Sequence, residues 1–261
     1  MNYGLYLSAS GVLTNMYRQD VYANNLANAS TVGFKRDLAS ISQRDPESIE
    51  GGHAMQWRHN LLDQLGGGVF AGRQQISFQQ GAMEKTGNAL DMAIDGSDGF
   101  FVVNKSNGAG QAELRFTRDG RFTRNAEGFL VTVAGGLNVL DPEDRPIKLA
   151  DGGPISVTDD GRIRQNGEEV ARIQVANVID RERLRKDGGN LMKYEGAGDG
   201  RTAAGNVRVR SGFVESSGVD PIRELLGLIE TNGAVQLNAQ MIKHHDQLMD
   251  RAVNSLGRVN A

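Results

Sequence analysis

The chain has 261 residues, of which 39% are hydrophobic and 23% are charged, and 29 basic against 32 acidic side chains leave a formal net charge of -3. This composition is typical of a soluble globular protein, and neither sign of charge forms a run that would attract nucleic acid or an anionic membrane. The chain contains no cysteine, which excludes disulfides, thiolate nucleophiles and cysteine-ligated metal sites.

The first twenty residues predict neither a secretory signal nor a transmembrane segment. No basic residue precedes their apolar positions, and Ser8, Ser10 and Thr14 interrupt the hydrophobic stretch. We therefore expect either a cytoplasmic protein or one that is exported without a cleaved signal peptide.

A long helix is predicted over residues 3–27, which contain no proline. Apolar residues recur there at alternating intervals of four and three residues, with Gln19 as the polar interruption. This spacing is typical of a coiled-coil-like seam. The apolar positions are Leu5, Ala9, Val12, Met16, Ala23 and Leu26.

Two further regions follow this helix. Residues 38–89 are polar, lack a sustained period and carry glycine clusters, which predicts an extended connector that is partly β and becomes ordered on assembly. Residues 90–217 contain short β-type runs between turn signals, which predicts an all-β domain of barrel or sandwich kind. The expected hairpin turns are Asp95-Gly96, Asp119-Gly120, Asp160-Gly161 and Asn166-Gly167.

A second long helix is predicted to begin near Pro221, with Asp220 as its N-cap. Its positions at alternating intervals of three and four are mostly apolar, and the two polar ones, Asn232 and Asp246, are candidates for fixing register and partner number. An ordinary amphipathic helix on a core is the alternative. The seam positions are Leu225, Leu228, Asn232, Val235, Ala239, Ile242, Asp246, Met249, Val253 and Leu256.

The predicted fold class is therefore α+β. Residues 1–37 and 218–261 are expected to form a terminal helical domain with coiled-coil-like packing. Residues 38–89 are the connector, and residues 90–217 form a mainly antiparallel β domain.

Candidate chemical sites are weak throughout the chain. The glycine-rich run 196–200 lacks the spacing of a dinucleotide-binding loop, and the adjacent His244 and His245 diverge on a helix, so we interpret them as a solvated flank. The acidic residues of the segment 91–98 are better explained by a turn than by calcium. The sequence therefore predicts no catalytic, cofactor-binding or metal site. A hydrolase would need a convergent pocket in the β domain.

One segment is far more specific. Residues 24–37 read NNLANASTVGFKRD at the point where the first helix must end. Asn28, Ser30 and Gly33 suit a cap and a turn, Phe34 suits an apolar anchor, and the following residues, Lys35-Arg36, suit a solvated exit.

This segment resembles the N-terminal signature of the flagellar rod and hook protein family. Segments 90–102, 116–131 and 212–220 are similar to later landmarks of that family, in the same order, while Gly218 and residues 233–236 depart from its usual pattern. The positions that match the signature are Asn24, Asn25, Leu26, Ala27, Asn28, Thr31, Gly33, Phe34 and Lys35.

The resemblance implies a structural subunit of the bacterial flagellar basal-body rod, which polymerises helically and transmits torque to the hook. Length and the opening residues GLYLSASG favour the F type (proximal rod) slightly over the G type (distal rod). The implied partners are copies of the chain, other rod subunits, the hook and the flagellar type III export apparatus, with no nucleic acid and no small-molecule substrate.

The apolar seam positions of both helices are then the expected assembly interface. In this interpretation the helices line the inner tube, the connector bridges subunits and the β domain forms the outer layer. A non-flagellar dimeric module, with a helical stalk and a ligand-binding β domain, is the alternative. A discrete dimer in solution would favour that module.

Overall fold

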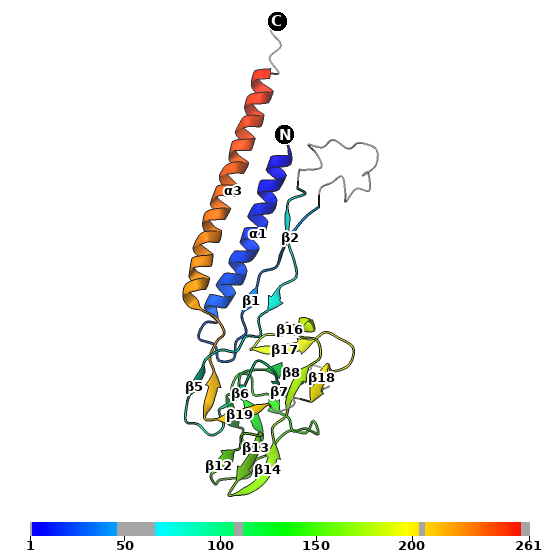
Figure 1. Ribbon diagram of the computed structural model, residues 1–261, viewed down its shortest axis with the longest axis vertical. Helices are drawn as coiled ribbons and strands as arrows, with labels where there is room; N and C mark the ends of the chain where they lie inside the picture. The colour runs from blue at the N-terminus through cyan, green and yellow to red at the C-terminus, as the bar shows by residue number, and fades with distance from the viewer. Residues whose placement is uncertain (1, 46–65, 107–111, 204–206, 257–261) are drawn as a thin grey trace. The chain divides into compact units, whose positions relative to one another are not determined.

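The computed structural model describes residues 2–45, 66–106, 112–203 and 207–256 (Figure 1). Its contacts divide the chain into two compact units. The helical unit comprises Met1–Ala27, Asp37–Gln75 and Asp220–Ala261, and the β-rich unit comprises Asn28–Arg36 and Ile76–Val219. No helix in the described ranges is long and apolar enough to cross a membrane.

Two long α-helices occur in the described part of the chain, α1 (Asn2–Ala27) and α3 (Pro221–Leu256). Both were predicted from the sequence. α3 begins where proline can occupy the first helical position without losing a hydrogen bond, and the Asp220 carboxylate accepts hydrogen bonds from the backbone N–H groups of Ile222 (3.1 Å) and Arg223 (3.4 Å). The expected N-cap is thus confirmed.

The helical unit also contains short strands that precede and follow the undescribed residues 46–65. β2 (Ile41–Gln43) pairs antiparallel with β3 (Val69–Ala71), and Ser42 lies opposite Phe70. β1 (Asp37–Leu38) pairs with β4 (Gln75–Ile76). The hairpin packs along α1, because a Cβ on Gly68 would lie 3.0 Å from the Ser10 hydroxyl.

The β-rich unit is built from antiparallel strands. In its described residues, nine strands form the main sheet, three form a second sheet, and two further pairs stand apart. The main sheet contains β7 (Phe100–Ser106), β8 (Ala112–Thr117), β9 (Phe122–Arg124), β10 (Leu130–Thr132), β11 (Asn138–Val139), β15 (Val175–Val178), β16 (Leu184–Lys186), β17 (Leu191–Tyr194) and β18 (Arg201–Ala203). The second sheet contains β12 (Ile155–Val157), β13 (Arg162–Gln165) and β14 (Glu168–Arg172). The pairs are β6 (Met92–Asp95) with β19 (Arg208–Ser211), and β5 (Met83–Lys85) with β20 (Phe213–Glu215), and the 3-10 turn η1 (Arg181–Arg183) precedes β16.

Strand β7 is buried on both faces and organises the core. Successive side chains of a strand point to opposite faces, and Phe100 and Phe101 accordingly belong to two different buried clusters. The Phe101 ring lies edge-on to Phe122 with centroids 5.1 Å apart, and the Phe100 ring meets Phe116 at 6.3 Å. The apolar run FFVV therefore fills two layers of core at once.

The α+β class and the antiparallel sheets are confirmed, whereas coiled-coil packing of the helices stays a prediction. Among the expected turns, Asp160-Gly161 joins β12 to β13 and Asn166-Gly167 joins β13 to β14, both antiparallel neighbours. Asn166 (φ 56°) and Gly167 (φ 88°) have the positive φ values of a two-residue hairpin.

The other two expected hairpins are wrong. β6 ends at Asp95 but pairs with β19, which is distant in sequence, and β8 pairs with β7 and β17 instead of with β9. Gly120 serves a different purpose, since a Cβ there would overlap the carbonyl oxygen of Met92. An Asp-Gly dipeptide predicts a local turn, but it cannot specify which strands pair across it.

Candidate assembly surface and signature site

The two helices run antiparallel to each other (Figure 1), and two glycines of α1 lie close to side chains of α3. A Cβ on Gly4 would lie 2.6 Å from the His245 ring, and a Cβ on Gly11 would lie 3.1 Å from the Asn238 amide. Both spaces are available only because the residue is glycine. At these two positions the backbone of α1 therefore approaches side chains of α3 closely.

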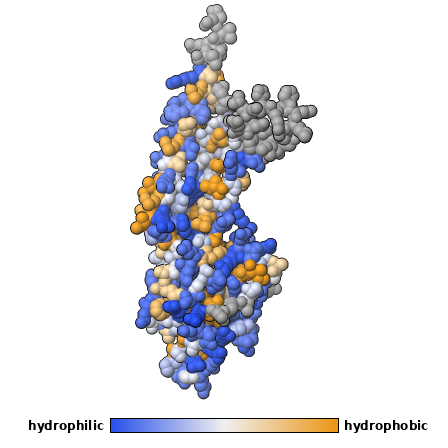
Figure 2. Space-filling view, viewed as in Figure 1, coloured by the Kyte–Doolittle hydropathy of each residue, from blue (hydrophilic) through white to orange (hydrophobic). Residues whose placement is uncertain are grey.

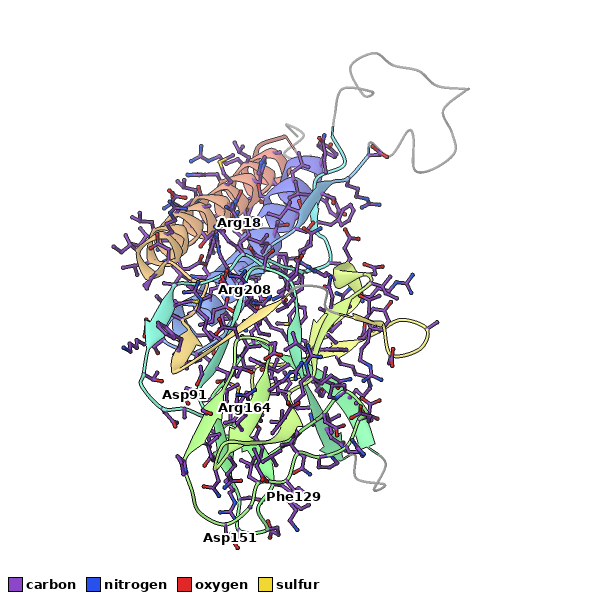
Figure 3. All side chains as sticks on the ribbon, turned by 60° about the horizontal axis from the view of Figure 1, so that its bottom comes forward. Arg18, Asp91, Phe129, Asp151, Arg164 and Arg208 are labelled. Atoms are coloured by element: carbon purple, nitrogen blue, oxygen red, sulfur yellow. The ribbon has the colours of Figure 1, made fainter. Side chains whose placement is uncertain are left out.

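A similar contact lies toward the other end of α1. A Cβ on Gly227 would lie 2.8 Å from the Tyr22 ring, and Arg18, labelled in Figure 3, places its guanidinium 5.9 Å from that ring's centroid. The intervals between successive contacts on α1 are close to whole helical turns, so one face of α1 supplies all of them. His245 of α3 is half-buried and packs against this face of α1 at Gly4, so its interpretation as a solvated flank is wrong, whereas His244 is exposed.

The predicted apolar positions of α1 lie on a different face. The side chain of Met16 is 48% exposed, Ala23 is exposed, and Leu5, Ala9, Val12 and Leu26 are half-buried. The exposed Leu13 (69%) adjoins this stripe. Periodicity correctly located an apolar face of α1, but the partner helix of the same chain packs on the neighbouring face, where glycine allows closer contact.

Apolar side chains of α3 are likewise left outside. Leu225 is 50% exposed and Val253 is 72% exposed, and Ile222, Leu226, Ile229 and Leu237 are also more than half exposed. Figure 2 shows such hydrophobic residues at the surface of the region that the helices form. Of the remaining predicted positions, Leu228, Val235, Ile242 and Met249 are half-buried, Ala239 is exposed, and the side chain of Leu256 lies outside the described residues.

The polar residues expected to fix register are not in the seam. Asn232 and Asp246 are both exposed. The buried polar residues of α3 are instead Glu224 and Thr231, and the Thr231 hydroxyl donates to the carbonyl of its own helix at Gly227 (2.8 Å). Asn232 and Asp246 therefore do not set the register of the contact within the chain, and their role in fixing register between subunits stays a prediction.

Part of the signature segment forms a polar node in the helical unit. Asn25 is fully buried, its Oδ1 accepts from the backbone N–H of Asp37 (2.9 Å), and its Nδ2 donates to the Asp37 carbonyl (2.9 Å) and to Glu224 Oε2 (3.0 Å). Only an amide side chain offers a donor and an acceptor in this geometry. Asn25 thus joins the end of α1 to the start of α3 and to strand β1.

The next part of the signature packs within the β-rich unit. Gly33 has φ 69°, and a Cβ there would lie 2.5 Å from the backbone carbonyl carbon and oxygen of Arg118. Its N–H donates to the Glu215 carbonyl (2.6 Å). Phe34 is buried, as predicted, and the Lys186 ammonium lies 3.6 Å from its ring centroid. Glycine at position 33, which has no side chain, is what allows this loop to approach the backbone of Arg118 so closely.

Lys35 is not a solvated exit. It is fully buried, with Nζ 2.6 Å from Glu215 Oε1 and 2.9 Å from the carbonyl of Gln79. The same carboxylate accepts from Arg118 Nη1 (3.1 Å), so two buried cations share one anion. Burial lowers the pKa of Lys35 and of Arg118, and the attraction of Glu215 opposes that shift.

Sequence reasoning missed Glu215 as the partner of Lys35, because nothing local connects residues 180 positions apart. One signal was available, since both residues lie in segments that carry the family resemblance. The departures at positions 218 and 233 have no packing cause here: a Cβ on Gly233 meets nothing within 4 Å, and one on Gly218 makes only ordinary contacts.

Three parts of the sequence match models of known protein families. Residues 5–35 match the flagella basal body rod protein family, residues 93–168 the flagellar hook protein FlgE/F/G D1 domain, and residues 210–256 the flagellar basal body rod FlgEFG protein C-terminal region. The FlgF rod protein of Caulobacter vibrioides is 34% identical over 100% of both chains. The FlgG rod protein of Bacillus subtilis is 30% identical over 96% of this chain and 97% of its own. The chain belongs to the flagellar basal-body rod protein family, of the FlgF/FlgG type.

Family membership makes this chain a structural rod protein of the flagellar basal body, in a family not known for enzymatic activity. The FlgF rod protein of Mesorhizobium japonicum, 30% identical over 98% of this chain and 99% of its own, agrees. The two nodes at Asn25 and Lys35 both fall in the matched rod segment 5–35. The signature of this rod-protein family is therefore built from residues that hold local structure, each within its own unit.

A surface depression of about 460 Å³ in the β-rich unit is a candidate active site if the chain were an enzyme. Three acidic residues line it: Asp144 and Asp199 pair with Arg201, and Asp160 pairs with Arg162. Hydrogen bonds from Arg201 lower the pKa of Asp144 and Asp199, and the Thr158 hydroxyl and Arg162 lower that of Asp160. Ion-paired carboxylates of this kind are poor general bases. Within the described residues there is no group of three or more side chains that could hold a metal ion.

Proposed function

We propose that the chain is a subunit of the bacterial flagellar rod that polymerises helically and transmits torque from motor to hook. The observation that carries the proposal is the surface of the helical unit, on which many large apolar side chains of α1 and α3 are exposed. Large exposed apolar surfaces mark sites of protein association. Burial of Leu13, Leu225 and Ile229 against neighbouring subunits would remove that surface from water.

In this proposal the terminal helices, residues 1–37 and 218–261, line the inner tube with coiled-coil-like packing. The connector, residues 38–89, bridges neighbouring subunits, and the β-rich domain, residues 90–217, forms the outer layer. The two-layered core around β7 supports the last role, because close-packed interiors have low compressibility and transmit load.

We further propose the F type. Two relatives from one organism support this choice, since the FlgF protein of Caulobacter vibrioides is 34% identical over 100% of this chain and its FlgG protein is 31% identical over 93%. The partners would be copies of this chain, other rod subunits and the hook. Export would proceed through the flagellar type III apparatus without a cleaved signal peptide.

The exposed apolar side chains also suggest that the helices are disordered in the free subunit. Helices gain most of their stability from tertiary packing of an apolar face, and α1 and α3 keep much of theirs exposed. Amide exchange measured by NMR on the free full-length chain should show little protection in residues 2–27 and 221–256. Strong protection there would contradict this part of the proposal.

The assembly interface is tested by placing charge on its exposed positions. Met16→Asp and Leu225→Asp should leave the folding of the full-length chain unchanged, because both side chains are about half exposed, yet abolish incorporation into basal bodies and motility. Gln240→Asp, also exposed on α3, is the control and should swim normally. Normal motility of both the Met16→Asp and the Leu225→Asp variant would contradict the assignment of these positions to the assembly interface. A discrete dimer in solution would support the binding-module alternative.

A further inference from the structure

One glycine in the interior of α3 has no explanation in packing. Gly233 lies well inside Pro221–Leu256, where glycine is less favourable than every residue except proline. A Cβ at Gly233 would meet nothing within 4 Å, whereas one at Gly4 of α1 would lie 2.6 Å from the His245 ring. What distinguishes Gly233 is the residue before it, Asn232, whose side chain is exposed.

An asparagine followed by glycine can cyclise. The backbone nitrogen of Gly233, after losing its proton to water or hydroxide, attacks Cγ of Asn232, and the new C–N bond closes a five-membered succinimide ring while the side-chain nitrogen leaves as ammonia. Water then opens the ring at either carbonyl and gives aspartate or isoaspartate. Glycine favours the attack because no side chain hinders its nitrogen. The reaction consumes one water, releases one ammonia and needs no oxidant.

The folded helix blocks this reaction. In α3 the N–H of Gly233 donates to the carbonyl four residues earlier, and the helical backbone torsions hold its nitrogen away from Cγ of the preceding side chain. The side chain of Asn232 is also engaged, because its Oδ1 accepts from Gln236 Nε2 (3.4 Å). Succinimide formation therefore requires that α3 opens at this point.

We infer that Asn232 is a modification site of the unassembled chain, where deamidation through Gly233 proceeds until assembly folds α3. This inference rests on the proposed function, in which the helices are disordered in the free subunit. Isoaspartate carries its Cβ in the main chain, so it interrupts the series of backbone hydrogen bonds between residues four apart. A chain modified at position 232 cannot complete α3, and deamidation thus excludes aged subunits from assembly.

The chain supplies a matched control in Asn166-Gly167. This pair forms the turn between β13 and β14, and Asn166 is exposed, as Asn232 is. Strand pairing on both sides fixes the torsions of this turn in the β-rich unit, so its reactivity should not depend on assembly. The third Asn-Gly pair, at positions 107–108, lies outside the described residues. A second control is Asn238, which precedes alanine and shares the tryptic peptide 224–243 with Asn232.

Peptide mapping of the free full-length chain tests the site. The purified chain is incubated at mildly alkaline pH and digested with trypsin, and peptides 224–243 and 165–172 are analysed by mass spectrometry. Isoaspartate is identified by methylation with protein isoaspartate methyltransferase and S-adenosylmethionine. We expect conversion at Asn232 at least tenfold faster than at Asn166 and at Asn238. In concentrated urea, Asn232 and Asn166 should react at similar rates. Equal rates at these two positions in the native buffer would overturn the inference.

A second measurement tests protection by assembly. In isolated basal bodies held in the same buffer, Asn232 should convert no faster than Asn166, and the unassembled chain of the same cells should carry at least tenfold more isoaspartate at position 232. Gly233→Ala should suppress the conversion of Asn232 even in urea, because a methyl group hinders the nitrogen, and should assemble normally because α3 has space for it. Conversion in basal bodies as fast as in the free chain would overturn the inference.

The outcomes separate this inference from the proposed function. Absence of the wild-type chain from basal bodies would overturn both. If the chain is present there and the amides of α3 exchange freely in the free subunit, but Asn232 reacts no faster than Asn166, the modification site alone is wrong. Slow conversion together with protected amides would show that α3 folds before assembly. That result would overturn the modification site and the proposed disorder, and would leave the rod assignment standing.

Discussion

The two units of the chain differ in how far they bury their large apolar side chains. In the β-rich unit Phe101 and its neighbours are fully buried, and the surface is occupied by ion pairs such as Lys105–Asp187. In the helical unit Gly4 and Gly11 of α1 lie close to side chains of α3, while Leu13 and Ile222 face outward at 69% and 71% exposure. The β-rich unit therefore buries its large apolar side chains, whereas the helical unit leaves many of them exposed.

This difference also separates two uses of buried polar groups. The Asn25 node holds three chain segments of the helical unit by hydrogen bonds to backbone and to one carboxylate. The Lys35 node holds a loop in the β-rich unit by charge. Buried ion pairs contribute little net stability, but breaking one of them is costly because a charge is left alone.

The largest loss of folding stability should come from truncating a buried side chain in the core of the β-rich unit. Phe101→Ala removes a fully buried ring that meets Phe122 edge-on, and such truncations destabilise by about 3–5 kcal/mol. Leu13→Ala, in the helical unit, should leave the free energy of unfolding of the free chain unchanged within error. Urea titration of both full-length variants checks the comparison. Equal losses would show that α1 is folded into the stable part of the free chain.

The next effect should come from the Lys35 node. Glu215→Gln keeps the shape of the side chain but leaves Lys35 and Arg118 buried without an anion, which should cost about 3 kcal/mol. Glu143→Gln is the matched control, because its pairing with Arg145 is at the surface, where ion pairs contribute little. Thermal unfolding measures both. Similar melting temperatures for the two variants would contradict the buried-charge argument.

A smaller loss is expected at the glycine of the signature. Gly33→Ala must place a methyl group 2.5 Å from the Arg118 backbone at a positive φ, and we expect a loss of about 2 kcal/mol. Gly87 also has positive φ (79°) but open space around it, so Gly87→Ala measures the backbone strain alone, about 1 kcal/mol. The difference in urea midpoint between the variants gives the steric contribution. Equal midpoints would show that the loop moves away from Arg118.

The extent of prediction from sequence differs between the units for a physical reason. Helix limits follow from local signals, and Pro221 with Asp220 located the start of α3 correctly. Periodicity found the apolar face of α1, but it could not reveal that Gly4 and Gly11 define the face that meets α3, because periodic patterns weight large side chains. The burial of Lys35 depends on Glu215, a contact that local patterns do not encode.

The smallest effect concerns acid. The Asp187 carboxylate accepts from Lys105 Nζ and Arg115 Nε, each at 2.7 Å, and these bonds lower its pKa. A carboxyl group with a lowered folded-state pKa contributes stability above the unfolded value of about 3.9, and that contribution is lost as pH falls through the folded value.

Asp187→Asn should therefore be slightly less stable than the wild type at pH 7, by under about 1 kcal/mol because the site is partly exposed, and the difference should shrink as the pH falls below the unfolded-state pKa of about 3.9. Asp246→Asn, on the exposed side of α3, is the control and should match the wild type throughout. Urea midpoints recorded between pH 2.5 and 7 measure the effect. A difference that grows toward low pH would have the opposite sign and would refute the pairing of Asp187 with Lys105 and Arg115.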